Sequence, residues 1–498
     1  MVARLNNDFT CEARDPRVPL SRQTTEGIRY HMAVTSPDSG TGLSQGAKRS
    51  IIGGIISLLI DSYDIYVPAF ILPAAMNYFE PSTMAATTKV TLVSVIFTVT
   101  LLARPVGGPI FGHLGDKIGR KRVTMICGAG FTVTTLVVAC LPGYSTLGYG
   151  ALVALIVLRF VDGVFLGGGY AGPVPLAIER SPARLRGLVG GVVSAGAPVA
   201  IIFISVVQLT ALNQIAPAGY QSWGWRLPFF FGVLLGIGYL VYYARVPEVD
   251  VEALAKARES RRAPLLELFS GPNFRNLLQV FLLMTGMWFA AQMMLSFLPG
   301  LLIGVLHQNA SDVSTMEIVA NVTTVVAMIS VAALSQRIGR RVTLIASAAA
   351  VTVIASLAYA FMVVLANGGS GFVPIAVLAI IGFVCVNAPL GAIVVYLNER
   401  FGKGIRSSGY GTAYTVSLIL PSLYSVWIGL LQHVMPYDYA PLVLVVLGGV
   451  LFAAGAWIGP ETVTGGTLAD ADAVVAEAGV TAGRPRPAQP STTGGEAS

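Results

Sequence analysis

The sequence predicts an all-α membrane protein in which twelve transmembrane helices form two six-helix halves. Three observations predict this fold: the composition, the recurrence of long apolar stretches, and the placement of lysine and arginine between them. Of the 498 residues, 54% are hydrophobic and 11% are charged, whereas a soluble domain carries about 25% charged residues. The composition therefore favours a chain that lies mostly within a bilayer.

Long apolar stretches recur from Ile51 to Gly459. Each can cross the hydrocarbon of a membrane, which takes ~20 apolar residues in a helix. A backbone in lipid has to satisfy its own hydrogen bonds, so we expect helices; the stretches are too long and too uniformly apolar for barrel strands. The predicted spans run roughly over residues 50–78, 88–113, 121–142, 148–177, 187–212, 225–246, 276–306, 313–335, 341–366, 372–397, 407–432 and 439–459.

Lysine and arginine are concentrated in alternate connections. They precede the first span and follow spans two, four, six, eight and ten. The connections without Lys or Arg are 143–147, 213–222, 307–312, 367–371 and 433–438. Basic loops stay in the cytoplasm, so the alternation predicts a multi-pass inner-membrane protein with both termini cytoplasmic. The same placement explains the net charge of +7 without a nucleic-acid partner.

Polar segments set the expected division of the chain. We expect a disordered cytoplasmic tail at 1–49, six-helix halves at 50–246 and 276–460, a charged cytoplasmic loop at 247–275 and a disordered tail at 461–498. No cleavable signal is apparent, and Met32 is an alternative start. The cysteines and histidines show neither a disulfide framework nor metal-ligand spacing, so we expect no metal and no cofactor.

A basic, glycine-rich motif occurs once in each half. Residues 112–122 read GHLGDKIGRKR, and residues 334–341 read LSQRIGRR, without the acid. Repetition of one motif indicates a duplicated transporter. The first copy resembles the loop signature of the major facilitator superfamily, which implies the major facilitator fold. The resemblance gives a gating role to Gly112, Gly115, Asp116, Gly119, Arg120 and Lys121.

Other segments resemble the metabolite:proton symporters of that superfamily. They are DSYD at 61–64, RPVG at 104–107, ERSP at 179–182, WGWRLPFF at 223–230 and ERF at 399–401. Members of that family take up small organic acids and zwitterions with protons. The resemblance adds Glu179, Arg186, Glu399 and Arg406 to the expected gate. The sequence departs from the family in span four, where Asp162 replaces an amide and Gly169 replaces an acid.

Four ionisable residues fall near the middle of predicted spans one and four. Asp61 and Asp64 share a helix face, as do Arg159 and Asp162. If these faces meet, three carboxylates surround one guanidinium, which stays protonated. Repulsion and lost hydration both disfavour the ionised carboxyl, so we expect at least one acid to bind a proton reversibly. Asp64 is the favoured carrier.

The arginines have alternative roles. Arg159 is either the partner of the proton-carrying acid or the anchor of an anionic substrate. A fixed salt bridge to Asp162 that only holds the helices together is the structural alternative. Arg104, nearer the cytoplasmic end of span two, is assigned to gating or anchoring, with substrate binding as its other role.

We expect the second half to carry no deep acid and to contribute polar and aromatic lining. The candidate substrate-binding residues, helix packing being the alternative for each, are Tyr63, Tyr66, Arg159, Trp288, Gln292, Asn387 and Tyr414, with Asn321 and Tyr410 beside them.

The predicted function is secondary active transport: symport of a small organic acid or zwitterion with protons by alternating access, performed by a monomer in the lipid bilayer. The first alternative is a proton-driven exporter of a drug-like or secondary metabolite, because Gly196-Ala197-Pro198 partly matches a span-five motif of antiporters. A membrane enzyme or sensor is the second, although no catalytic constellation supports it. The sequence leaves sodium open as the coupling ion.

Overall fold

The computed structural model describes residues 45–81, 83–118, 120–169, 174, 177–178, 181–245, 268–401, 406–464 and 467–468. Within these ranges twelve helical segments of 19 to 35 residues are long and apolar enough to cross a membrane. At a rise of ~1.5 Å per residue even the shortest reaches ~28 Å, close to the thickness of hydrocarbon. The predicted twelve-span, all-α architecture is confirmed.

The first six spans form the first half of the molecule. The first helix begins five residues before the predicted boundary at 50. The elements are α2 (Gln45–Ala75), η1 (Met76–Tyr78), α3 (Ala86–Ile118), α4 (Arg120–Ala139), α5 (Tyr144–Leu147), α6 (Gly150–Gly169), η2 (Ala183–Leu185), α8 (Arg186–Ser194), α9 (Gly196–Gln214), α10 (Pro217–Gly219), η3 (Tyr220–Gly224) and α11 (Arg226–Ala244).

The second half repeats the pattern with more breaks in its helices. Its elements are α14 (Gly271–Ala291), η4 (Gln292–Phe297), α15 (Leu298–Gly300), η5 (Leu301–Val305), α16 (Ala310–Ile338), α17 (Arg340–Ala350), η6 (Val351–Ala355), α18 (Ser356–Asn367), α19 (Phe372–Asn387), α20 (Leu390–Glu399), α21 (Arg406–Val416), α22 (Ile419–Ser422), α23 (Tyr424–Leu431) and α24 (Ala440–Ile458). A short antiparallel pair follows, β1 (Val463–Thr464) with β2 (Thr467–Leu468).

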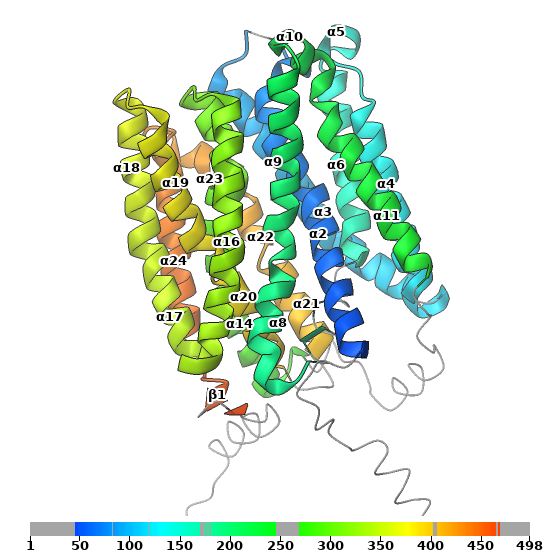
Figure 1. Ribbon diagram of the computed structural model, residues 1–498, viewed down its shortest axis with the longest axis vertical. Coiled ribbons are helices and arrows are strands. Elements are labelled where there is room, and N and C mark those ends of the chain that lie inside the picture. The colour runs from blue at the N-terminus through cyan, green and yellow to red at the C-terminus, as the bar shows by residue number, and fades with distance from the viewer. Residues whose placement is uncertain are drawn as a thin grey trace, which may run out of the picture. The chain divides into compact units, whose positions relative to one another are not determined.

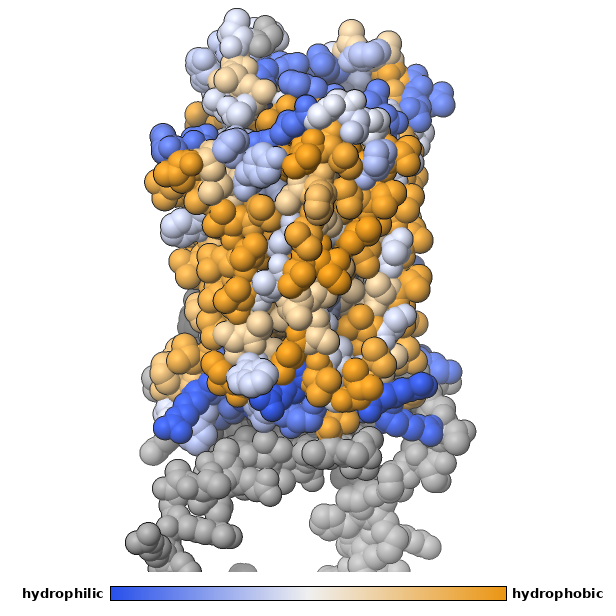
Figure 2. All heavy atoms as spheres, turned by 90° about the vertical axis from the view of Figure 1, so that its left-hand side faces the viewer, coloured by the Kyte–Doolittle hydropathy of each residue, from blue (hydrophilic) through white to orange (hydrophobic). Residues whose placement is uncertain are grey.

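Positive charge separates the two ends of the helices. The end at which α2 and α4 begin, called the basic end below, carries most of the described lysines and arginines, including Lys48, Arg122 and Arg341. At the other end, called the opposite end, the described ones are Lys89 and Arg226. The spans run between these ends (Figure 1), and on the face seen in Figure 2 hydrophobic side chains cover most of the surface between them. This belt matches the hydrocarbon of a bilayer.

Several spans are broken where the two halves face each other. Span seven changes from α14 to the π-helix η4 at Gln292, ahead of Pro299. Span five breaks between α8 and α9 just before Pro198, and span ten between α19 and α20 at Pro389. Proline removes a helical hydrogen bond, and π-helical turns are frequent at functional sites. These breaks therefore mark the region in which a ligand site is expected.

Helices α3 and α6 pack closely because glycines of α6 lie against the backbone of α3. A Cβ at Gly163 would run into the backbone of Thr100, and one at Gly167 into that of Arg104. Gly163 and Gly167 thus serve the close packing of α6 against α3. The close approach brings the arginines of α3 and α6 into the interior of the first half.

The second copy of the basic motif takes its acid from a distant segment. Glu461, after the last span, accepts hydrogen bonds from the backbone nitrogens of Arg340 at 2.7 Å and Arg341 at 3.0 Å. These N–H groups begin α17 and have no partner within that helix. Gly339 has a φ of 104°, which favours glycine, and a Cβ there would clash with the Glu461 carboxylate. Glu461 therefore caps α17.

Replacement of Glu461 by alanine removes this cap, and loss of a helix cap costs about 1 kcal/mol. We expect Glu461→Ala to lower the melting temperature of the purified protein in detergent, and Glu461→Gln, which keeps an acceptor oxygen, to lower it less. Equal melting temperatures of Glu461→Ala and the parent protein would contradict the capping role.

Candidate substrate and proton site

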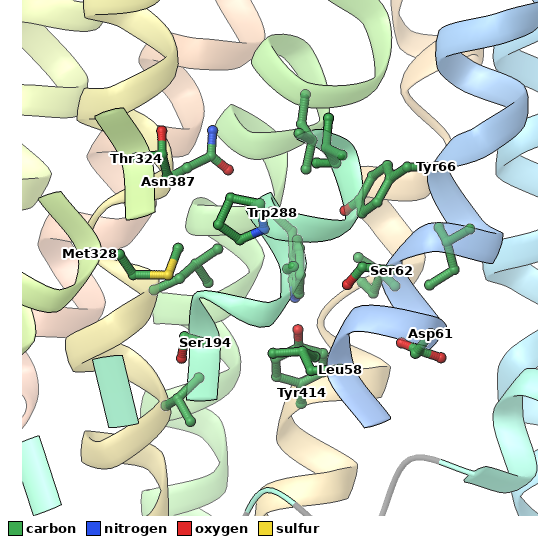
Figure 3. A pocket seen from close by; sticks show the side chains of 18 of the residues that line it. Leu58, Asp61, Ser62, Tyr66, Ser194, Trp288, Thr324, Met328, Asn387 and Tyr414 are labelled. Carbon is green, nitrogen blue, oxygen red and sulfur yellow. The ribbon is translucent and has the colours of Figure 1, made fainter. Parts of the chain in front are cut away.

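A pocket lies between the two halves, beside the breaks in spans five, seven and ten. It offers about 70 Å³ to the centres of water molecules, where a single water needs ~10–15 Å³. The space suits a small solute. Figure 3 shows Asp61, Ser62 and Tyr66 on one side, and Thr324 and Asn387 on the other. The polar and aromatic lining comprises Asp61, Ser62, Tyr66, Arg104, Ser194, Trp288, Gln292, Asn321, Thr324, Asn387, Tyr410 and Tyr414.

An ion pair forms the charged side of this pocket. Arg104 of α3 donates from Nη2 to Oδ1 of Asp61 on α2 at 2.5 Å. The Asp61 side chain keeps 16% of its exposure and that of Arg104 keeps 7%. A close, charge-assisted contact of this kind is strong in a poorly hydrated place. The pair is neutral only while Asp61 is ionised.

A second charge network lies deeper in the first half. Arg159 of α6 is fully buried, with Nη1 3.1 Å from Asp162 and 3.8 Å from Asp64 of α2. Its Nη2 donates to the backbone carbonyl of Asp64 at 2.9 Å. Thr134 of α4 donates to Asp162 at 2.8 Å, and Thr135 donates to Asp64. One guanidinium therefore holds two carboxylates, and the two threonines join α4 to the helices α2 and α6.

The two networks together contain three carboxylates and two guanidinium groups. With every acid ionised, the interior would carry one uncompensated negative charge, which is costly in a low dielectric. One bound proton removes this excess. The arrangement can therefore take up and release a proton while the arginines stay charged.

The structure corrects three expectations about this cluster. The expectation that three acids surround the single guanidinium of Arg159 is wrong, because Asp61 pairs with Arg104 instead. Arg159, predicted as a substrate anchor, is absent from the pocket lining and lies between helices. Tyr63 points away from the pocket; its hydroxyl donates to the carbonyl of Pro228 at 2.7 Å.

The second half gives the pocket an aromatic and polar wall. Tyr414 meets Trp288 edge-on, with ring centroids 5.1 Å apart, and stacks on Tyr410 at 5.9 Å. On the first-half side Tyr66 stacks on Phe97 at 5.5 Å. The aromatic rings can cover apolar or cationic parts of a solute.

Four uncharged side chains of the pocket lining each have a buried polar atom with no hydrogen-bond partner among the described residues. These atoms are Ser194 Oγ, Trp288 Nε1, Asn321 Oδ1 and Thr324 Oγ1. A buried polar group without a partner costs about 1–3 kcal/mol. Water or a polar ligand in the pocket would remove that cost, so these atoms form a ready hydrogen-bonding surface. Ser194 and Thr324 were not among the predicted residues.

The second half also contains a buried acid that was not among the predicted residues. Glu317 of α16 is 3% exposed and accepts a hydrogen bond from Ser205 of α9 at 3.1 Å. It lies near the opposite end, outside the pocket lining. Over the described residues no group of three His, Cys, Asp or Glu side chains could hold a metal ion.

Most of the predicted gate lies outside the part of the chain that the structure describes. The structure does not describe Gly119 or Glu179. It also does not describe the surroundings of Gly112 and Gly115 or the side chains of Asp116, Arg120 and Arg406. Of the others, Lys121 donates to the carbonyl of Ala244 at 3.0 Å, Arg186 donates to that of Ser181 at 3.4 Å, and Glu399 meets the buried Arg340 at 3.3 Å. These three contacts each stay within one half.

Among the described residues outside the spans, one acid has a shifted pKa. Glu80 follows η1 at the opposite end and is 1% exposed. Burial raises the pKa of its carboxyl to about 7, against the Lys89 ammonium, which lies 3.7 Å away and lowers it. The loop between spans one and two therefore changes its charge near neutral pH.

Comparison with known proteins identifies the family of this chain. The family model of the Major Facilitator Superfamily matches residues 54–425, more than half of the chain. The chain belongs to the Major Facilitator Superfamily. It is thus a twelve-span membrane transporter and not an enzyme.

Solved Major Facilitator Superfamily structures share this fold. The proton:xylose symporter XylE, bound to 6-bromo-6-deoxy-D-glucose, matches with a TM-score of 0.66 and 15% identity over 87% of this chain and 100% of that one. XylE from E. coli in a partially occluded, inward-open conformation also gives 0.66, over 84% and 99%. At this identity the likeness concerns the fold alone.

Relatives within the superfamily have the names of metabolite transporters. The inner membrane metabolite transport protein YhjE of Escherichia coli is 33% identical over 44% of this chain and 50% of the relative. The shikimate transporter of the same organism is 29% identical, over 47% and 54%. The chain spans about half the length of these two relatives. Its match to the E. coli proline/betaine transporter, at 26% identity, covers 80% and 82%.

Replacement of Arg159 by methionine leaves Asp64 and Asp162 buried without their guanidinium, and loss of one partner from a buried ion pair costs about 3–5 kcal/mol. We expect Arg159→Met to lower the melting temperature in detergent far more than Arg122→Gln, which changes an exposed arginine of α4. Addition of Asp162→Asn should recover part of the loss. A melting temperature equal to that of Arg122→Gln would contradict the network.

Proposed function

We propose that the chain carries a small organic acid or zwitterion across the inner membrane together with a proton. One observation carries the proposal: the Asp61–Arg104 pair, at 2.5 Å, lines the pocket between the halves. The pair joins a protonatable group to a fixed positive charge at the position where a solute would bind. The names of the relatives, transporters of metabolites, shikimate, and proline or betaine, agree with solutes of this class.

The pair explains how a proton and an anion would be coupled. When Asp61 binds a proton, Arg104 loses its counter-charge and can hold the carboxylate of the substrate. Without the proton, Asp61 competes with the substrate for the same guanidinium. Proton and carboxylate therefore stabilise each other's binding, which is the linkage that a symporter requires. Asp61 replaces Asp64 as the favoured carrier, because it faces the pocket.

The deeper Asp64–Arg159–Asp162 network supports this exchange. Arg159 holds two carboxylates, so a proton released by Asp61 has a second acceptor nearby within the same half. The network also fixes α2, on which Asp61 sits. In this proposal the four predicted residues share the coupling, with Asp61 in contact with the solute and the other three behind it.

The remaining pocket groups would bind the rest of the solute. Trp288 Nε1 offers a donor, Asn321 Oδ1 an acceptor and Thr324 Oγ1 both. Gln292 and Asn387 add amides, and the rings of Tyr66 and Tyr414 can face an ammonium group. Hydrogen bonds and a carboxylate anchor together favour a small polar metabolite over a large apolar drug.

The distribution of basic residues supports one orientation of the protein in the membrane. The basic end lies in the cytoplasm by the rule that lysine and arginine stay inside, so both termini are cytoplasmic. Rocking of the halves would expose the pocket to each side in turn. The whole pocket is built by one chain, so a monomer suffices.

Export is the alternative direction. Ala197 and Pro198, from the partial antiporter motif of span five, line the pocket. Uptake of labelled organic acids by proteoliposomes, with the pH gradient imposed in each direction, separates the two. Symport is supported if solute accumulates on the alkaline side, and contradicted if it accumulates on the acidic side. Replacement of the pH gradient by a sodium gradient tests the coupling ion.

Asp61→Asn mimics the protonated acid permanently. We expect this variant to lose uptake driven by a pH gradient by at least about tenfold, because proton release can no longer drive the cycle. Exchange of labelled for unlabelled solute, which needs no net proton movement, should persist. Asp64→Asn is the matched comparison and should retain more driven uptake. Driven uptake unchanged in Asp61→Asn would remove Asp61 from the mechanism.

Trp288→Phe keeps a ring in the pocket but removes the indole donor. Loss of a hydrogen bond to a charged solute group costs about 1.5–3 kcal/mol, which is roughly 10- to 150-fold in affinity. We expect the half-saturating solute concentration to rise by such a factor with little change in melting temperature. Trp427→Phe, outside the pocket, serves as control. No change in Trp288→Phe would show that the indole N–H does not bind solute.

A further inference from the structure

One buried acid has no role in the mechanism above. Glu317 lies on α16 of the second half, where this helix packs along α9 of the first half (Figure 1). Its side chain is 3% exposed, and the hydroxyl of Ser205 donates to its Oε2 at 3.1 Å across the contact between the halves. The contact belongs to the opposite end, away from the basic motifs.

The surroundings of Glu317 are polar but carry no positive charge. Over the described residues no Lys, Arg or His nitrogen lies within 4.0 Å of its carboxylate. Gln208, three residues after Ser205, donates to the carbonyl of Phe70 at 3.1 Å, while its Oε1 is buried without a described partner. The buried hydroxyl of Tyr220 also has none.

The elements packed around α16 supply few titratable groups. Helix α9 and the π-helix η5 contain no acidic or basic residue, and α19 contains only Cys385. The charged residues of α8, α17 and α20 lie at the basic end. Tyr220 of η3 interacts electrostatically with Glu317 and is a titratable side chain of the same layer. The ionisation of Glu317 therefore depends on contact with water rather than on a neighbouring charge.

A lone carboxylate in this place favours its neutral form. An ionised group that is buried without a cation loses its hydration and gains only one hydroxyl donor. The neutral acid avoids this loss and adds an O–H donor to a region that contains unpaired acceptors. Separation of α9 and α16 at this end would admit water and stabilise the ionised form.

We infer that Glu317 is a second proton-binding site, distinct from the Asp61–Arg104 pair, which holds a proton while the halves are closed at the opposite end and releases it when they open there. Because the proton binds the closed arrangement better, proton binding favours closure by the same amount. The step is a simple protonation: the carboxylate takes a proton from water and returns it to water. The inference rests on the opening of the two halves and not on the identity of the solute.

The pocket has a direct connection to this site. Asn321, one helical turn from Glu317, donates from Nδ2 to the carbonyl of Glu317 at 2.9 Å. Asn321 also lines the pocket, and the Oδ1 of its side chain is buried without a described hydrogen-bond partner. A solute that binds Asn321 therefore holds the turn of α16 that carries the acid.

The rim of the same contact provides a reporter. Asn213 of α9 accepts a hydrogen bond from Ser311 of α16 at 3.3 Å. In a chain whose native cysteines are replaced by serine, Asn213→Cys and Ser311→Cys should form a disulfide when this end is closed. At each pH the rate of disulfide formation is divided by the rate measured for the same cysteine pair in a chain that also carries Glu317→Gln, whose amide stays neutral. This ratio of rates cancels the pH dependence of the thiols.

We expect this ratio to fall as the pH rises, by up to about tenfold per pH unit for one linked proton. Glu80→Gln is the matched control, because it neutralises a buried acid at the same end but away from α9 and α16; it should leave the fall unchanged. The fall should also persist in Asp61→Asn. A ratio that does not change with pH overturns the inference, and a fall that vanishes in Asp61→Asn assigns the proton to the pocket instead.

A second measurement covers the case in which Glu317→Gln does not fold. Spin labels at positions 213 and 311 of the chain with native Glu317 report the separation of α9 and α16 directly. We expect the distance distribution to widen toward longer distances at high pH. An unchanged distribution contradicts the inference without any variant of Glu317.

Discussion

The structure of the first half depends on the need to compensate charge inside an apolar layer. Arg159 cannot lose its proton, so its guanidinium needs negatively charged partners nearby. The carboxylates of Asp162 and Asp64 lie 3.1 and 3.8 Å from it. The contact fixes α2 against α6, while glycine at 163 and 167 lets α3 approach α6 closely enough for backbone contact. Packing and charge compensation therefore determine the same helix arrangement.

This arrangement separates two kinds of buried charge. Arg159 and its partners are closed off from the pocket, whereas Asp61 and Arg104 border it. A closed network stabilises the helices and changes its protonation only by exchange with a neighbour. A bordering pair can exchange its partner for a solute. The second half contributes aromatic rings and neutral polar atoms to the pocket. These groups can fit the shape of a solute and form hydrogen bonds with it, and they add no charge that competes with Asp61 or Arg104.

Hydropathy and basic loops predicted the twelve spans because both follow from the bilayer itself. Side-chain direction was harder to predict. The residues of α2 that line the pocket are 58, 61, 62, 65 and 66, one helical face, and Tyr63 falls on another. The spacing of these residues shows that they share one face of the helix. It does not show which neighbouring helix or cavity that face meets. Arg104 was missed as the partner of Asp61 because its depth pointed to a gate. Glu317 was overlooked because it lies only four residues inside its predicted span, where an acid resembles an ordinary end-of-helix charge.

Buried acids at different places in an alternating-access protein respond to different events. An acid that borders the pocket responds to the solute, because the two compete for one guanidinium. An acid in the contact between halves responds to closure, because closure removes its water. Among the described residues no cation lies within 4.0 Å of Glu317, so in the inferred role its protonation would follow the movement of α9 against α16 more directly than that of an acid beside an arginine. Two sites of this kind in one chain would let external pH act on the conformational equilibrium even when the pocket is empty.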